Sequence, residues 1–103
     1  MKNEKAKRTP RPWSTAYTRA FEKDWDRYEK AGRHNMRRLK EVMLLLMAND
    51  GSLPAEWRDH PLKGDWQGYR ECHIGGDFLL VYRLEGGTLY FTRLGTHADL
   101  FET

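Results

Sequence analysis

Residues 78–94 read FLLVYRLEGGTLYFTRL, and this stretch decides the fold class of the chain. Residues 78–82 form a nearly unbroken apolar run, which is typical of a strand in the middle of a sheet. Glu85-Gly86-Gly87-Thr88 follows, and such residues can make the tight turn of a hairpin. Residues 89–94 then return as the partner strand. The stretch therefore predicts a β-hairpin at the centre of a sheet.

A third strand is predicted just before this hairpin, separated from it by Gly75-Gly76. Residues 69–74 alternate in character, which places Tyr69, Glu71 and His73 on one face and the intervening residues on the other. A further short strand is possible around residues 56–59. The C-terminal half of the chain is thus expected to be a sheet.

The N-terminal half has the spacing of helices instead. Ser14 is the predicted cap of a first helix, in which apolar residues recur every three or four positions. These are Tyr17, Phe21, Trp25 and Tyr28. Ala31-Gly32 is expected to end this helix, and Asn35 to cap a second one that stops at Asn49-Asp50-Gly51. The two helices are predicted to form an antiparallel hairpin.

These elements predict an α+β fold, with an N-terminal helical hairpin packed on one face of an antiparallel β-sheet. At 103 residues the chain can build one such core, so we predict a single domain over residues 13–103. Residues 1–12 are basic, contain proline and lack periodicity, and are expected to form a flexible tail.

The composition excludes several classes of protein. No apolar run approaches the roughly 20 residues that cross a bilayer, and no secretory signal pattern is present, so we expect a cytoplasmic protein. Cys72 is the single cysteine, which excludes an intrachain disulfide and a cysteine-rich zinc site. The net charge of +3, with basic residues crowded at the N-terminus, suits a polyanionic partner or a solvated tail.

Three of the four histidines fall in the sheet half, beside glycines or strand ends: His60, His73 and His97. A lone histidine is usually a surface or hydrogen-bonded residue, but three together favour acid–base chemistry near neutral pH. RNA supplies its own nucleophile, the 2′-OH, so a pair of imidazoles is sufficient to cleave it. Asp77, just past the turn after His73, can orient an imidazole or can be a turn aspartate.

Other side chains could bind the substrate. Arg93, four residues before His97, is best placed to stabilise a charged transition state, while Arg70 and Arg83 can bind a phosphate or remain solvated. Phe101, Trp66 and Tyr69 could stack on a nucleobase, although aromatic residues more often belong to the core.

No cofactor is predicted. The histidines, Cys72 and Asp77 do not have the spacing of a metal-binding motif, so no metal is expected. The Gly75-Gly76 and Gly86-Gly87 pairs lack the lysine and helix start of a phosphate loop, which makes nucleotide hydrolysis improbable.

Three motifs in order resemble the YafQ branch of the RelE toxin superfamily. They are DHPLKGDWQGYRECHI (59–74), GGDFLLVYRL (75–84) and FTRLGTHADLF (91–101). The resemblance covers roughly residues 21–101. It implies the RelE-like microbial ribonuclease fold and a toxin of a type II toxin–antitoxin pair, which cuts mRNA in the ribosomal A site. It further implies contact with ribosomal RNA, a cognate antitoxin, and DNA binding only through the antitoxin complex.

The resemblance also implies roles for single residues. His60 would be the general base on the 2′-OH and His97 the general acid for the 5′-oxygen, with His73 and Asp77 in support. Arg93 and Phe101 match positions that relatives also use. Phe78 stands where some relatives have tryptophan, and we expect it to contact the substrate together with Phe101.

The sequence alone is also consistent with two other hypotheses of function. The chain could be a non-catalytic module that binds RNA or the ribosome, or a degenerate toxin that acts mainly in an antitoxin complex repressing its own operon.

Overall fold

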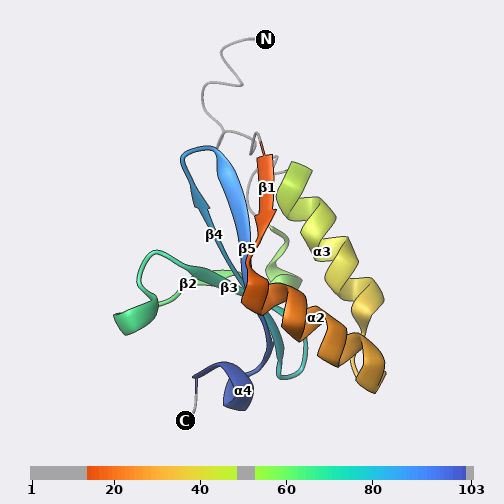
Figure 1. Ribbon diagram of the computed structural model, residues 1–103. Coiled ribbons are helices and arrows are strands. Elements are labelled where there is room, and N and C mark those ends of the chain that lie inside the picture. The colour runs from red at the N-terminus through yellow and green to blue at the C-terminus, as the bar shows by residue number, and fades with distance from the viewer. Residues whose placement is uncertain (1–13, 49–52, 102–103) are drawn as a thin grey trace.

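The computed structural model describes residues 14–48 and 53–101, which form one sheet with two long helices on one of its faces (Figure 1). The predicted tail at residues 1–12, Trp13 and the turn at residues 49–51 lie outside the described residues. No helix in the described part of the chain is long and apolar enough to cross a membrane.

The sheet has five strands in the order β1-β5-β4-β3-β2. The central strand β4 (Phe78–Glu85) is antiparallel to both β5 (Thr88–Thr96) and β3 (Arg70–Gly75). Gly86 and Gly87 have φ angles of 58° and 82°, which glycine adopts at little cost, and they turn the β4–β5 hairpin. The predicted hairpin and the strand before it are therefore confirmed.

The first strand was not expected from the sequence. Ser14 does not cap a helix, because β1 (Ser14–Tyr17) pairs in parallel with β5, with Ser14 opposite Thr88. The helical spacing that begins at Tyr17 has another cause, since the Tyr17 ring stacks on both Phe21 and Phe91 from the strand. The sheet is therefore mixed, although mostly antiparallel.

Helix α2 (Arg19–Ala31) begins one turn later than predicted. Thr18 is its cap, and its hydroxyl accepts a hydrogen bond from the Phe21 amide at 3.0 Å. Gly32 ends it in the left-handed region, at φ 67°, as the sequence predicted. Asn35 caps α3 (Met36–Ala48) as predicted, with its side-chain oxygen 3.0 Å from the Arg38 amide. The two helices form a V that opens away from their connection (Figure 1).

Side chains of α2 continue the edge of β5 where the short β1 ends. Thr18 donates its hydroxyl to the Thr92 carbonyl at 2.7 Å, and the Leu94 amide donates to Asp24 at 3.0 Å. One step further, the Thr96 amide donates to the Tyr28 hydroxyl at 3.2 Å. Successive backbone groups of a strand edge therefore bind a helix instead of another strand.

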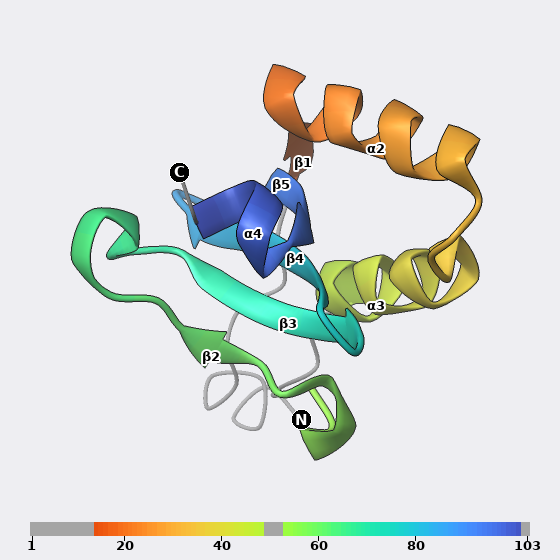
Figure 2. The same cartoon turned by 90° about the horizontal axis from the view of Figure 1, so that it is seen from below.

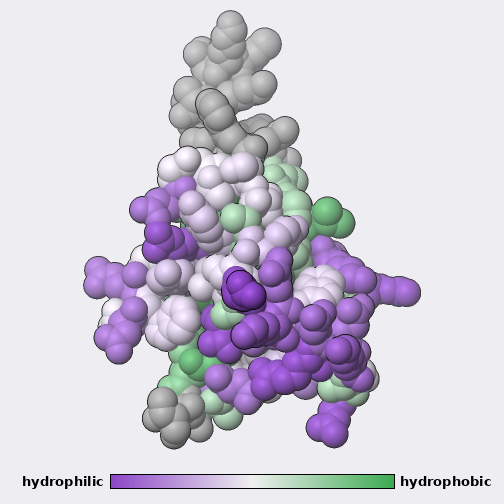
Figure 3. Space-filling model, in the orientation of Figure 1, coloured by the Kyte–Doolittle hydropathy of each residue, from purple (hydrophilic) through white to green (hydrophobic). Residues whose placement is uncertain are grey.

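The core lies between the sheet and the two helices. Its buried residues include Phe21, Leu39, Val42, Cys72, Ile74, Phe78, Leu80 and Phe91. The outer surface over α2 is hydrophilic (Figure 3). Burial of this one apolar face is the main stabilising contribution to the fold.

The segment between α3 and β3 differs from expectation. Residues 56–59 are not a strand, because Ala55–Trp57 forms a 3-10 helix, η1, that buries Trp57 completely. The edge strand β2 (His60–Pro61) follows, and a second 3-10 helix, η2 (Gly64–Trp66), leads to β3. A short helix, α4 (His97–Phe101), ends the described chain on the sheet face opposite α2 and α3 (Figure 2).

Candidate active site

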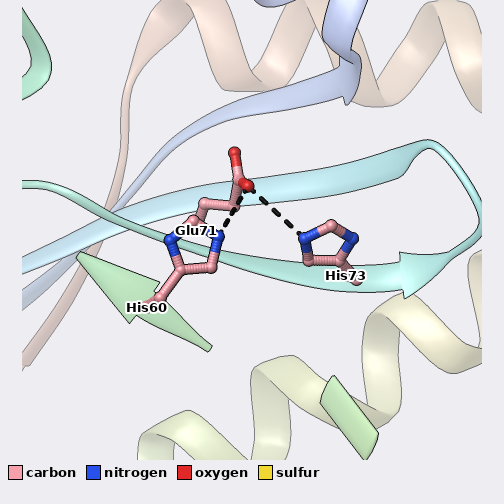
Figure 4. A group of neighbouring side chains, drawn as sticks. All are labelled: His60, Glu71 and His73. Carbon is pink, nitrogen blue, oxygen red and sulfur yellow. Dashed lines mark hydrogen bonds and ion pairs between the residues drawn. The ribbon is translucent and has the colours of Figure 1, made fainter. Parts of the chain in front are cut away.

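The strand β3 carries the centre of the candidate site. Its alternation turns Cys72 and Ile74 toward the helices, while Glu71 and His73 lie on the other face. The edge strand β2 is antiparallel to β3 with His60 directly opposite Glu71. This register gathers three titratable side chains on the open face of the sheet (Figure 4).

Glu71 connects the two histidines. One of its carboxylate oxygens, Oε2, lies 2.9 Å from His60 Nε2 and 3.4 Å from His73 Nε2. Glu71 is only 3% exposed, and its other oxygen, Oε1, has no hydrogen-bond partner among the described residues. A buried carboxylate with a free acceptor oxygen is costly, so its position requires the imidazoles beside it.

A second carboxylate holds the third histidine. Asp77, in the turn between β3 and β4, accepts a hydrogen bond from the backbone amide of His97 at 3.2 Å and also contacts its ring Nδ1. The hydrogen bond from the His97 ring lowers the pKa of the exposed Asp77 carboxyl. Asp77 is therefore ionised at neutral pH and fixes the His97 ring at the start of α4.

The three imidazoles form a row. Ring centroids are 6.0 Å apart between His60 and His73, and 6.2 Å apart between His73 and His97. Two carboxylates contact the row: Glu71 lies between His60 and His73, and Asp77 contacts His97. Such an arrangement can place two imidazoles on opposite sides of one phosphate, one to accept a proton and one to donate it.

Phe101 lies at the end of this row, and Phe78 does not. The Phe101 ring is 6.0 Å from His97 and meets the edge of Trp66 at 5.5 Å. Phe78 is 2% exposed and packs in the core against Tyr28 and His34, at 5.1 and 4.5 Å. The expectation that Phe78 contacts substrate is wrong, because its position in β4 turns the ring toward the helices.

The predicted arginines each have a partner within the protein. Arg93 binds Asp24 through two nitrogens at 2.7 and 3.2 Å, and this hydrogen bonding raises the pKa of its guanidinium.

The other two arginines lie further along the sheet. Arg70 is 3.3 Å from Asp59, while Arg83 lies over the ring of Tyr69 and donates to its hydroxyl at 3.3 Å. Among the described residues, no hydrogen bond joins these arginines, or Arg93, to the three imidazoles.

Glu71 is the site residue that sequence reasoning missed. Its alternation with His73 already placed the two on one face, but the register of β2, which adds His60, is not visible in the sequence. His60, Glu71 and His73 also have ligand atoms within 4.8 Å of one another, and two imidazoles with a carboxylate suit a first-row transition metal. The absence of a linear motif therefore did not exclude a set of metal ligands.

The fold and the histidine row define a class of protein, the bacterial toxins of type II toxin–antitoxin systems. Within this class the chain belongs to the YafQ family, whose pattern matches residues 13–102.

Individual relatives agree with this family. The chain is similar to the mRNA interferase toxin YafQ of Escherichia coli K12, with 45% identity over 86 residues, 82% of this chain and 91% of the relative.

Two solved structures share the fold. The E. coli DinJ–YafQ toxin–antitoxin complex has a YafQ-like chain with 42% identity and a TM-score of 0.78, covering 84% of this chain and 94% of that one. A metal-bound toxin from Helicobacter pylori has 36% identity and a TM-score of 0.75, covering 85% and 98%.

Proposed function

We propose that this protein is an mRNA interferase, a toxin that cleaves mRNA in the A site of the translating ribosome. The observation that carries the proposal is the row of three imidazoles, in which Glu71 contacts His60 and His73 and Asp77 contacts His97. The E. coli relative at 45% identity, itself an mRNA interferase toxin, supports it.

The proposed reaction is a transfer of the phosphoryl group to the neighbouring 2′-oxygen. His60 accepts the 2′-OH proton at Nδ1, the ring nitrogen that does not face Glu71. The 2′-oxygen bonds to phosphorus, and the bond from phosphorus to the 5′-oxygen breaks. His97 donates a proton to the leaving 5′-oxygen. The products are a 2′,3′-cyclic phosphate and a free 5′-OH, so every proton and bond is accounted for without a further reactant.

The remaining residues support these two imidazoles. Glu71 lies between His60 and His73 and positions both, and Asp77 orients the His97 ring and stabilises its cation. His73, between the other two, faces the charge that develops on the phosphate. Arg93 can add to this stabilisation through the donor that Asp24 leaves free, and Phe101 offers a ring for a base to stack on.

The proposed mechanism uses no metal. The imidazoles of His60 and His73 that would bind a metal are the groups required for proton transfer and charge stabilisation, so a bound ion competes with catalysis. We expect zinc or copper, added at stoichiometric amounts, to inhibit cleavage, and a chelator that spares ribosomal magnesium to restore it. Activity that needs such a metal would contradict the metal-free mechanism.

The proposed partners are the ribosome with its mRNA and a dedicated antitoxin. A free toxin must present positive charge to RNA, and an acidic, partly disordered antitoxin can cover that surface as it folds. Contact with DNA is proposed only through this complex. Co-expression with the product of the adjacent gene should rescue growth and abolish cleavage. If neither that product nor another encoded nearby binds and rescues, the toxin–antitoxin assignment fails.

The sharpest test of the reaction changes one atom of the substrate. Purified ribosomes carry a defined mRNA in the A site, and the ends produced by the toxin are mapped. A matched mRNA with 2′-deoxyribose at the cleaved nucleotide should remain intact, while the unmodified mRNA yields the cyclic phosphate. Binding without cleavage of either mRNA would instead support the non-catalytic module.

A further inference from the structure

A groove of about 410 Å³ adjoins the histidine row, and His73 forms part of its wall. Its lining comes from three separate segments, the start of α3, the η1 region and the end of β3. The charged side chains in it are Arg38, Glu56 and Arg58, while Gly75 and Gly76 add only backbone. The groove therefore extends the candidate active site toward two arginines that sequence reasoning did not select.

Arg38 is held in place by the fold. Its Nε donates to the Ile74 carbonyl at 2.8 Å, and its guanidinium lies 4.2 Å above the buried ring of Trp57. Its nearest carboxylate is the exposed Glu56, with 3.9 Å between Nη2 and Oε1, which is a weak surface pair. A guanidinium that is fixed but weakly paired loses little freedom when it binds an anion.

Arg58 has an unusual backbone conformation. It follows η1 with φ 48° and ψ 48°, and is the sole residue other than glycine with positive φ among residues 14–48 and 53–101. Glycine or asparagine occupies this left-handed region more readily. Glycine would therefore stabilise this turn better than arginine does. The presence of an exposed arginine here requires a reason other than the turn.

We propose that this groove binds the mRNA phosphate next to the one that is cleaved, with Arg58 and Arg38 as its ligands. The inference rests on the proposed function, because it places the scissile phosphate at the imidazoles. His73 belongs to both the row and the groove, so a strand that continues from the row enters the groove with its next phosphate. Arginine forks match phosphate oxygens, with two donors per contact.

The lining explains why a phosphate is bound there and not a base. Apart from His73, no aromatic ring lines the groove in the described part of the chain, because Trp57 is buried beneath Arg38. Bases are held by stacking, whereas phosphates are held by charge and fix the register of the strand. The groove therefore positions the mRNA without selecting its sequence, and Phe101 lies outside it.

The test uses binding, so that it is independent of cleavage. Ribosomes carry an mRNA with 2′-O-methyl groups around the cleavage position, which prevents cleavage, and the dissociation constant of the toxin is measured. Arg58→Ala should weaken binding about tenfold, typical of one lost charge-assisted hydrogen bond. Arg58→Gly removes the same charge and suits the positive φ, so it should weaken binding equally while preserving the fold. Arg19→Ala, at the start of α2, is the matched control and should change binding less than twofold.

Neutral linkages then locate the contact. Methylphosphonate replaces, one at a time, the phosphate on either side of the scissile linkage. At the contacted position it should weaken wild-type binding, and Arg58→Ala should then have no further effect. Glu56→Gln, which removes the carboxylate beside Arg38, should tighten binding roughly twofold to fivefold with normal phosphates.

Two outcomes would overturn the proposal that the groove binds the adjacent phosphate. Arg58→Ala could bind as well as the wild type, or its tenfold loss could persist with either phosphate neutralised, which would assign Arg58 to ribosomal RNA or to the fold. Cleavage of unmodified mRNA is measured in parallel. Failure of the wild type to cleave it would contradict the proposed function. This result is distinct from the binding results that would overturn the proposed phosphate site.

Discussion

Two carboxylates are buried in the described part of this fold, and their surroundings differ in kind. Asp24 of α2, 5% exposed, has both oxygens engaged, by the Arg93 guanidinium and by the Leu94 amide. Glu71 of β3 has one oxygen shared by His60 and His73 and the other without a partner among the described residues.

The difference separates a region that stabilises the fold from the region where we propose that the chemistry takes place. Around Asp24 every acceptor has a donor, so the α2–β5 contact has one stable arrangement. Around Glu71 one carboxylate oxygen is shared by two imidazoles and the other has no partner among the described residues, an arrangement that is characteristic of functional sites. Removing a side chain should therefore affect stability in the first region and activity in the second.

The largest effect is expected at the end of the histidine row. His97→Ala should reduce the cleavage rate by about a hundredfold to ten-thousandfold, because a general acid is lost. Its exposed ring contributes little to packing, so circular dichroism should match the wild type and the urea midpoint should fall only slightly, through loss of the contact with Asp77. The rate on ribosomes with a defined mRNA is the measurement. Wild-type activity in folded His97→Ala would remove His97 from the mechanism.

Asp24→Ala should have its main effect on stability. It leaves Arg93 and the Leu94 amide without their acceptor, and the free energy of unfolding should fall by about 3 kcal/mol. Urea denaturation measures this loss. The matched control is Asp26→Ala on the exposed side of the same helix, which should change stability by less than about 0.5 kcal/mol. Equal losses of unfolding free energy in both variants would mean that the hydrogen bonds around Asp24 contribute no more to stability than an exposed aspartate does.

Glu71→Gln tests the difference between the two buried carboxylates most directly. It keeps the shape of the side chain but removes the charge between His60 and His73, so the cleavage rate should fall about tenfold to a hundredfold. Stability should change by less than about 1 kcal/mol, because the buried carboxylate was only partly paired. A large loss of stability with normal activity would reverse the roles assigned to the two carboxylates.

The smallest effect is expected at Asp77. Its pKa is lowered in the folded protein by the hydrogen bond from His97, so this contact stabilises the fold above the ordinary aspartate pKa of about 3.9. The contribution is lost as the pH falls through the lowered value. A small difference in urea midpoint between wild type and Asp77→Asn should be present at neutral pH and vanish in acid. In His97→Ala, nuclear magnetic resonance should show the Asp77 titration returning toward its ordinary value.

Local patterns predicted much of this architecture. The apolar run at residues 78–82, the glycine pair at 86–87 and the cap at Asn35 each specify an element through contacts within a few residues. Where two local signals competed, the prediction failed. The spacing of Tyr17 and Phe21 looked helical, although Tyr17 belongs to a strand and meets Phe21 across the boundary.

The candidate site was predicted less completely, for the same physical reason. The histidines stand out by residue type, but their grouping depends on the register between β2 and β3 and on the β4–β5 pairing. Phe78 was misplaced because an unbroken apolar run does not reveal which face each side chain occupies. Glu71 and Asp24 look like any other acidic residues until the pairing of distant segments buries them.

The parallel pairing of β1 with β5 has a consequence for how the protein is made. Ser14 and Thr88 are joined by a hydrogen bond although 74 positions separate them, and His97 lies beyond that pair. Contacts of such long range form late, since the loop between them must close first. During synthesis the sheet therefore cannot close before its C-terminal strand leaves the ribosome. His97 follows β5 directly, so the histidine row is assembled only after the earlier strands have been made.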